Sequence, residues 1–326
     1  MQGGATLRHI ALVARTKHVS LAEATRAAAA LQKQVVRDAG PIWALQASIS
    51  AFATLKDVPI GYWPVLIMDD IHHPGAAGIL LDKYGRPFAL VEYGPTWSLT
   101  ASHECLEILV DPSGNRQFSG PSPAPGQGEV SFLVEVCDPS EGAQFGYTIE
   151  GVLLYDFCTP NFFEHAGAGA RYSFTGAIKQ PLEVLKNGYL RWYEPVSKSW
   201  YQEQFFGSSP KFIDLGSPSA AYRCMREFTN RGEVDHRRLS HVSAASTVMR
   251  HAVARRRQHV DASAAFAEFL DEEIADLGRR LGEAAGRPRS RQDQFIADSR
   301  ADKSPRRVSV RVVSPSKTKI ERASEP

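Results

Sequence analysis

The segment from residue 97 to 110 constrains the fold more than any other, because the sequence marks both of its ends. Thr96, which follows a Gly-Pro pair, is a residue type that often caps the N-terminus of a helix. Pro112 forces the residue before it out of the helical region of backbone space. Between these limits apolar residues recur at helical spacing: Leu99, Leu106 and Leu109. The sequence therefore predicts a helix over residues 97–110.

Three polar residues inside this predicted helix form the pattern H-E-x-x-E: His103, Glu104 and Glu107. Residues four positions apart lie on one helical face, so His103 and Glu107 could hold one metal ion from one side. Imidazole nitrogen and carboxylate oxygen are both accepted zinc ligands. Glu104 lies beside them and could act as the base on a water molecule next to the ion. An amphipathic helix with a solvated polar stripe is the alternative interpretation.

The elements expected before this helix are mostly strands. Ser20 and Glu23 form a capping box that opens an Ala-rich helix, and Gly40-Pro41 is expected to end that helix. Apolar and β-branched runs predict strands at residues 8–15, 44–55, 63–71, 78–82 and 87–93. The predicted fold class is therefore α+β, with a sheet that precedes the H-E-x-x-E helix.

This order of elements, with its H-E-x-x-E helix, resembles the N-terminal subdomain of the zincin metalloproteases over residues 8–112. The resemblance implies a twisted mixed sheet and an active-site helix. It also implies that residues 78–82 form a short antiparallel edge strand lining the substrate cleft. Glu107 stands where zincins have the second His of H-E-x-x-H. The Met-turn and third His of metzincins are absent, so the gluzincin branch is the better comparison.

The gluzincin resemblance also implies a third metal ligand after the helix. In gluzincins this ligand is a downstream Glu, and an Asp a few residues further on often orients the first His. Glu135 and Asp138 occupy comparable positions here, so the resemblance implies that Glu135 binds the ion and that Asp138 orients His103. Asp111 and Glu141 rank after these two as candidates.

Residues 102–115, SHECLEILVDPSGN, are also similar to the signature of an uncharacterised bacterial and phage protein family. This resemblance implies no assigned activity. The expected function is that of a zinc-dependent peptidase, which cleaves a peptide or protein substrate with Glu104 as general base. The alternative is a non-catalytic interaction protein or virion-associated protein that retains a zincin scaffold.

Residues 113–215 are expected to complete this domain as a β-rich part, so that residues 1–215 form one zincin-like domain. A stretch rich in Pro, Gly and Ser predicts an exposed loop at 114–128, and hairpins are predicted at 145–157 and 189–206. The second hairpin carries four aromatic residues, Trp192, Tyr193, Trp200 and Tyr201. These are expected to fill a small core rather than bind a ligand.

Residues 216–326 are predicted to form a helical and partly disordered basic tail. From residue 231 onward there are 20 Lys and Arg against 14 Asp and Glu, whereas the rest of the chain has 18 against 22. Helical patterns occur at 242–260 and 262–285, and the sequence after Gly286 lacks the apolar content to fold alone. Nucleic acid could contact the basic stretches, but interspersed acids without interleaved aromatics favour a solvated tail.

The remaining sequence signals favour a cytoplasmic protein without a membrane segment. No apolar run is long enough for a secretory signal or a transmembrane helix. The four Cys are scattered without C-x-x-C spacing, which predicts reduced and mostly buried thiols. Asp69, Asp70, His72 and His73 are expected to form an ordinary solvated loop, and no nucleotide-binding motif is present.

Overall fold

The computed structural model describes residues 6–217, apart from 73–76, 83–85, 165, 166 and 168, together with 266–272, 274–276 and 279. The predicted helix at 242–260, Cys224, His73 and most of the basic tail lie outside the described residues. No helix among the described residues is long and apolar enough to cross a membrane.

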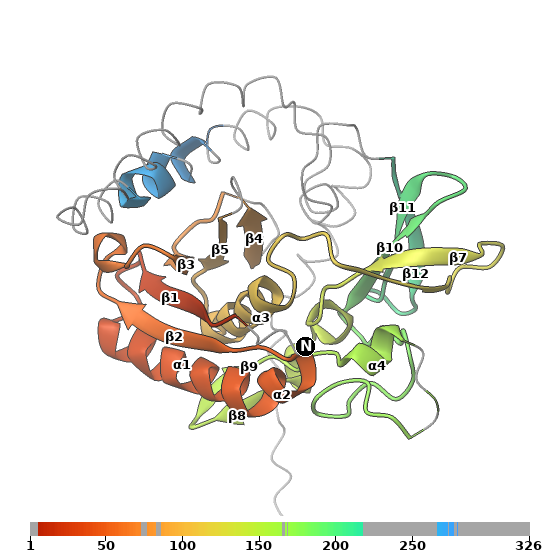
Figure 1. The fold of residues 1–326 in the computed structure, drawn as a ribbon, viewed down its shortest axis with the longest axis horizontal. Helices are drawn as coiled ribbons and strands as arrows, with labels where there is room; N and C mark the ends of the chain where they lie inside the picture. Colours follow the sequence, from red (N-terminus) through yellow and green to blue (C-terminus); the bar gives the residue numbers. More distant parts are fainter. Residues whose placement is uncertain are drawn as a thin grey trace, which may run out of the picture.

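A five-stranded mixed sheet forms the first half of the structure, with the strand order β2-β1-β3-β5-β4 (Figure 1). Four of its strands are parallel: β1 (Arg8–Ala14), β2 (Ala47–Phe52), β3 (Tyr62–Met68) and β5 (Pro87–Glu92). Strand β4 (Gly78–Asp82) lies at the edge and runs antiparallel to β5. The expected antiparallel edge strand is therefore present at residues 78–82.

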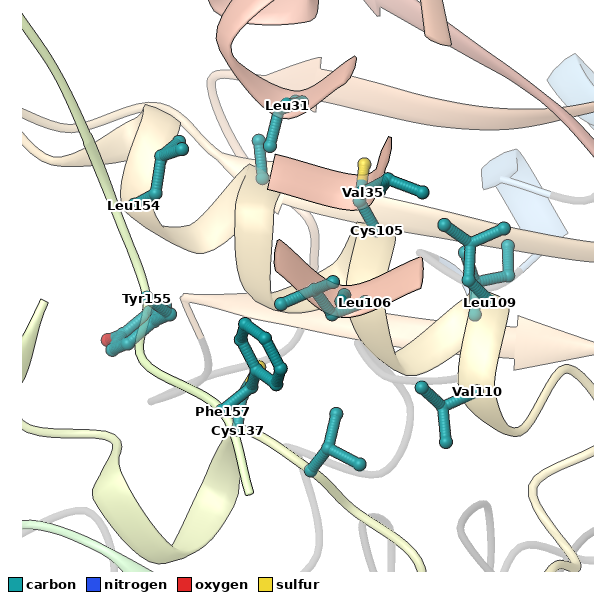
Figure 2. Close-up of a cluster of buried hydrophobic side chains, with 14 of the residues drawn as sticks. Leu31, Val35, Cys105, Leu106, Leu109, Val110, Cys137, Leu154, Tyr155 and Phe157 are labelled. Atoms are coloured by element: carbon teal, nitrogen blue, oxygen red, sulfur yellow. The ribbon is translucent and has the colours of Figure 1, made fainter. Parts of the chain in front are cut away.

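Two helices pack on one face of this sheet. Helix α1 (Leu21–Lys33) begins at the predicted capping box, and α3 (Trp97–Val110) has the predicted limits, although the Thr96 side chain makes no capping hydrogen bond. Figure 2 shows Leu31 of α1 above Leu106 of α3 within their shared core. The sheet and α3 thus share one apolar core, which holds α3 in a fixed orientation.

The first helix extends further than its sequence predicts. After α1 the chain continues as a π-helix (Gln34–Ala39) and a short helix α2 (Gly40–Trp43), and it ends where Ala44 adopts a left-handed φ of 55°. The prediction that Gly40-Pro41 ends the helix was therefore wrong. In the π-helical turn the Gly40 N–H donates a hydrogen bond to Val35 O, five residues earlier. Pro41 is therefore preceded by a turn that lacks the regular α-helical hydrogen-bond spacing, in which a proline would break the pattern.

The opposite face of the sheet is covered by helical residues from the predicted tail. Phe266, Ala267, Leu270 and Ile274 are buried in one cluster with side chains of β1, β3, β4 and β5. Arg15 also forms an ion pair with Asp271. Figure 1 shows this helical segment in blue, across the sheet from α1. These residues therefore belong to the folded body rather than to a solvated tail.

An antiparallel five-stranded sheet dominates the second half, with the order β12-β11-β10-β7-β6. The predicted hairpins are confirmed as β8 (Tyr147–Ile149) with β9 (Val152–Leu154), and as β10 (Tyr189–Glu194) with β11 (Ser199–Gln204). The remaining elements are β6 (Gln117–Pro121), β7 (Glu129–Leu133), α4 (Pro160–Phe163) and β12 (Lys211–Gly216). The predicted exposed loop at 114–128 was wrong in part, because β6 lies within it and pairs with β7.

The aromatic residues of the second hairpin serve as core. Trp192 and Trp200 are almost fully buried, and Tyr201 stacks against Trp192. With helices, a mixed sheet and an antiparallel sheet in one chain, the predicted α+β class is confirmed. The three described cysteines, Cys105, Cys137 and Cys158, are free and buried, as predicted.

Candidate metal centre

Three side chains converge between α3 and the chain that follows β7. One ligand atom each from His103, Glu107 and Asp138 lie within 4.8 Å of one another. His103 and Glu107 come from adjacent turns of α3, as their spacing requires. Asp138 begins the short 3₁₀ turn η3 (Asp138–Ser140), and its Oδ1 lies 3.1 Å from His103 Nε2. The helix supplies two donors and a distant turn supplies the third.

The polar face of α3 is not a solvated stripe. Glu104 is 4% exposed and Glu107 is 2% exposed, so the alternative interpretation of the H-E-x-x-E pattern was wrong. Burial of carboxylates is unfavourable unless charges or hydrogen-bond donors compensate them. The main-chain N–H of Cys137 donates a hydrogen bond of 2.9 Å to Glu107 Oε1. This contact also ties α3 to the segment that carries Asp138.

The three carboxylates change the protonation of His103. Burial alone would lower the pKa of its imidazole, but Asp138, Glu104 and Glu107 oppose this and raise the pKa to about 10. For Asp138, burial would raise the pKa of the carboxyl, but the contact with His103 holds it below its usual value. The edge of the Tyr155 ring meets the His103 ring, with centroids 5.4 Å apart. Without an ion, the imidazolium thus neutralises part of the carboxylate charge.

The donor set fits a divalent metal ion. Asp138 Oδ1 is buried and has no hydrogen-bond partner of suitable geometry within the described chain, despite its short distance to His103 Nε2. Such an oxygen can be compensated by a cation that also binds Glu107 and the neutral imidazole. One imidazole and two carboxylates without a thiolate suit Zn²⁺ and the neighbouring divalent metals of the first transition row.

Glu135, which was expected to be the third ligand, does not join this group. Its Oε1 lies 3.0 Å from Arg191 Nη1 on β10, and both side chains are buried. Glu135 and Asp138 are separated by an irregular turn, so one carboxylate faces β10 and the other faces His103. The group of possible ligands thus contains Asp138 and not Glu135.

The two remaining acidic candidates also lie outside the group. Asp111 accepts hydrogen bonds from the main-chain N–H groups of Asn115 and Arg116, so it stabilises the turn that follows α3. Glu141 follows η3 and is partly buried.

In the loop after β3, Asp70 accepts a hydrogen bond from the main-chain N–H of His72, as in an ordinary exposed turn.

Glu104 lies outside the three-ligand group but next to it on α3. A Cβ atom placed on Gly78 of the edge strand would lie 2.3 Å from Glu104 Oε1 and 2.7 Å from Thr100 Cγ2. The Glu104 carboxylate therefore occupies space that a side chain at position 78 would fill. The sequence gives no signal for this role of Gly78, because a glycine in a strand is usually expected only to weaken the strand.

No model of a known protein family matches this chain, and no match was found among curated proteins or solved structures. The functional assignment therefore depends on the site itself.

Proposed function

We propose that this protein is a metal-dependent hydrolase that cleaves peptide bonds, with zinc as its metal. The observation that carries this proposal is the convergence of His103, Glu107 and Asp138 beside a buried Glu104. A hydrolytic metal site needs three protein ligands, a position for water and a base close to that position. The two residues of α3 and the one residue of η3 would supply the three ligands, and Glu104 would supply the base.

Each residue then has a distinct role. When bound, the ion would polarise the substrate carbonyl and make a neighbouring water more acidic. His103, Glu107 and Asp138 would hold the ion, and Glu107 is itself oriented by the Cys137 N–H. Glu104 would accept the proton from the water and pass it to the leaving amine.

The edge strand supports a peptide as the substrate. Strand β4 lies at the edge of the mixed sheet, and its first residue contacts Glu104. An extended peptide can pair with such an edge through main-chain hydrogen bonds. A peptide paired with β4 near Gly78 would pass close to the proposed base.

Replacement of the base tests the proposal. We expect Glu104→Gln to retain metal and fold but to lose about 10²- to 10⁴-fold in hydrolysis rate, because an amide cannot accept the proton. His103→Ala should lose metal and activity together. The measurements are metal content and cleavage of an unfolded protein with and without a chelator. Glu164→Gln is the matched control, because Glu164 is exposed and follows α4.

A non-catalytic protein with a bound ion, such as an interaction or virion-associated protein, is the second candidate. The observation that favours it is the ligand set itself, which has two carboxylates and one imidazole. This extra negative charge makes a water next to the ion less acidic than two neutral imidazoles would. Wild-type protein that binds one ion but cleaves none of a varied set of unfolded substrates would support this second candidate.

A further inference from the structure

The turn that carries Asp138 packs directly against the chain entering β10. The Leu185 N–H donates a hydrogen bond of 2.9 Å to Pro139 O, and the Gly188 N–H donates one of 2.8 Å to Leu185 O. On its other side, Gly188 O accepts a hydrogen bond of 2.9 Å from the Phe205 N–H, which follows β11. Residue 188 is therefore held between η3 and the end of a strand.

Gly188 approaches the Asp138 turn at the level of the backbone. A Cβ atom at this position would lie 2.4 Å from Pro139 O and 2.7 Å from Asp138 O. Both are main-chain atoms, so no side-chain rotation could relieve the overlap. The glycine is required by this close approach and not by an unusual φ.

The other end of the same segment is fixed to α3. The Cys137 N–H donates to Glu107 Oε1, and the Cys158 N–H donates to Val136 O at 2.7 Å. A side chain at position 188 would therefore displace the chain just beyond Cys137, where Asp138 and Pro139 lie. Metal–oxygen bonds of about 2.0–2.2 Å leave little tolerance for such a displacement.

We propose that Gly188 is a positioning residue of the metal centre: its missing side chain lets η3 approach β10 closely enough for Asp138 to meet His103 and Glu107. This inference rests on the proposed metal site but does not require that the site be catalytic. It assigns a role in metal affinity to the residue that leads into β10, although this residue contributes no ligand of its own.

The first test measures Zn²⁺ affinity of the full-length protein by competition with a chromophoric chelator. We expect Gly188→Ala to weaken binding about 10- to 100-fold, as is typical when a support of a ligand is lost. Gly207→Ala is the matched control, because a Cβ atom there has no neighbour within 4 Å, and its affinity should stay within about twofold of wild type. Equal affinity of Gly188→Ala and wild type would overturn the proposal.

A double-mutant cycle then separates positioning from general destabilisation. If Gly188 acts through Asp138, Gly188→Ala should weaken Zn²⁺ binding no further in an Asp138→Ala background. Additive losses from the two changes would overturn the proposal. If Gly188→Ala does not fold, Leu185→Pro replaces it, because it removes the N–H that donates to Pro139 O and should show the same dependence on Asp138.

Crystal structures of the metal-free proteins keep this inference separate from the proposed function. In Gly188→Ala, Asp138 Oδ1 should move away from His103 Nε2, which it approaches to 3.1 Å in the wild type. If wild type fails to bind Zn²⁺ but this displacement is observed, the metal site and the function proposed for it are overturned, and only the effect of Gly188 on the position of Asp138 stands. If Asp138 stays in place, the positioning role is overturned whatever the metal result.

Discussion

At the scale of single residues, the buried negative charges of the candidate metal centre must be balanced by a positive charge. His103, 13% exposed in its side chain, faces three carboxylates from Glu104, Glu107 and Asp138. In the metal-free protein a proton on His103 offsets part of this negative charge. A bound divalent ion would replace that proton, so the same carboxylates that raise the pKa of His103 also attract the ion.

This exchange predicts proton release on metal binding. His103 is protonated below its pKa of about 10, and only the neutral imidazole binds a metal. At pH 7 we therefore expect about one proton from His103 to be released per Zn²⁺ bound. Between pH 6.5 and 9 the apparent affinity should rise about tenfold per pH unit. Calorimetric titrations in buffers of different ionisation enthalpy measure the released proton, and an affinity independent of pH in this range would contradict the prediction.

At the scale of elements, the site lies where three elements meet: α3, η3 and the edge strand β4. Helix α3 is held against the sheet by its apolar face, and Figure 2 shows Leu106 and Leu109 packed with Val35 and Phe157 in that core. Because tightly packed interiors resist small movements, the positions of His103 and Glu107 follow from the position of α3. The turn η3 then places Asp138 next to His103 and Glu107, and strand β4 places Gly78 next to Glu104.

The contact between β4 and α3 predicts that Glu104, the proposed base, can be displaced without loss of metal binding at the candidate centre. In Gly78→Ala the three atoms nearest to the new methyl group would belong to Glu104 and Thr100, so the Glu104 carboxylate would be displaced. We expect Zn²⁺ affinity within about twofold of wild type and a hydrolysis rate lowered about tenfold or more. Gly94→Ala is the control, since a Cβ atom at Gly94 has no neighbour within 4 Å. A parallel loss of metal would show that β4 supports the ligands as well.

At the scale of the whole molecule, the first sheet is covered on both faces. Helices α1 and α3 cover one face, and the helical residues at 266–272 and 274–276 cover the other. The second cover comes from a part of the chain far from the sheet in sequence. Its apolar side chains shield strands β1, β3, β4 and β5 from water, so the stability of the sheet depends on it.

The packing of this helical segment on the sheet predicts that a substitution within it lowers the stability of the whole protein, although it lies far from the candidate metal centre. Leu270 is 1% exposed, and Leu270→Asp would place a charge in an apolar cluster. We expect the free energy of unfolding to fall by about 3 kcal/mol or more. Glu268→Ala, on the exposed side of the same helix, should change it by less than about 0.5 kcal/mol. Denaturant titration measures both, and equal effects would mean that this helix does not stabilise the sheet.

The local features of this protein were determined by the sequence. Some structural signals act over only a few residues and can therefore be recognised in the sequence. Examples are Pro112 after α3, the capping box at Ser20 and the i, i+4 spacing of His103 and Glu107. The strands and helices that precede α3 and both hairpins were predicted from such local patterns, whereas the antiparallel character of the edge strand was implied by the zincin resemblance.

Only the tertiary structure shows which acid lies close enough to His103 and Glu107 to form a possible metal site with them. Glu135 and Asp138 have the same local signals, but Arg191 on β10 pairs with the first, while packing on α3 and Gly188 directs the second toward His103. The contact of Gly78 with Glu104 and the packing of the helical residues at 266–272 and 274–276 on the sheet could not be predicted from the sequence either. Each depends on a contact between segments distant along the chain, and such contacts exist only after the elements have packed.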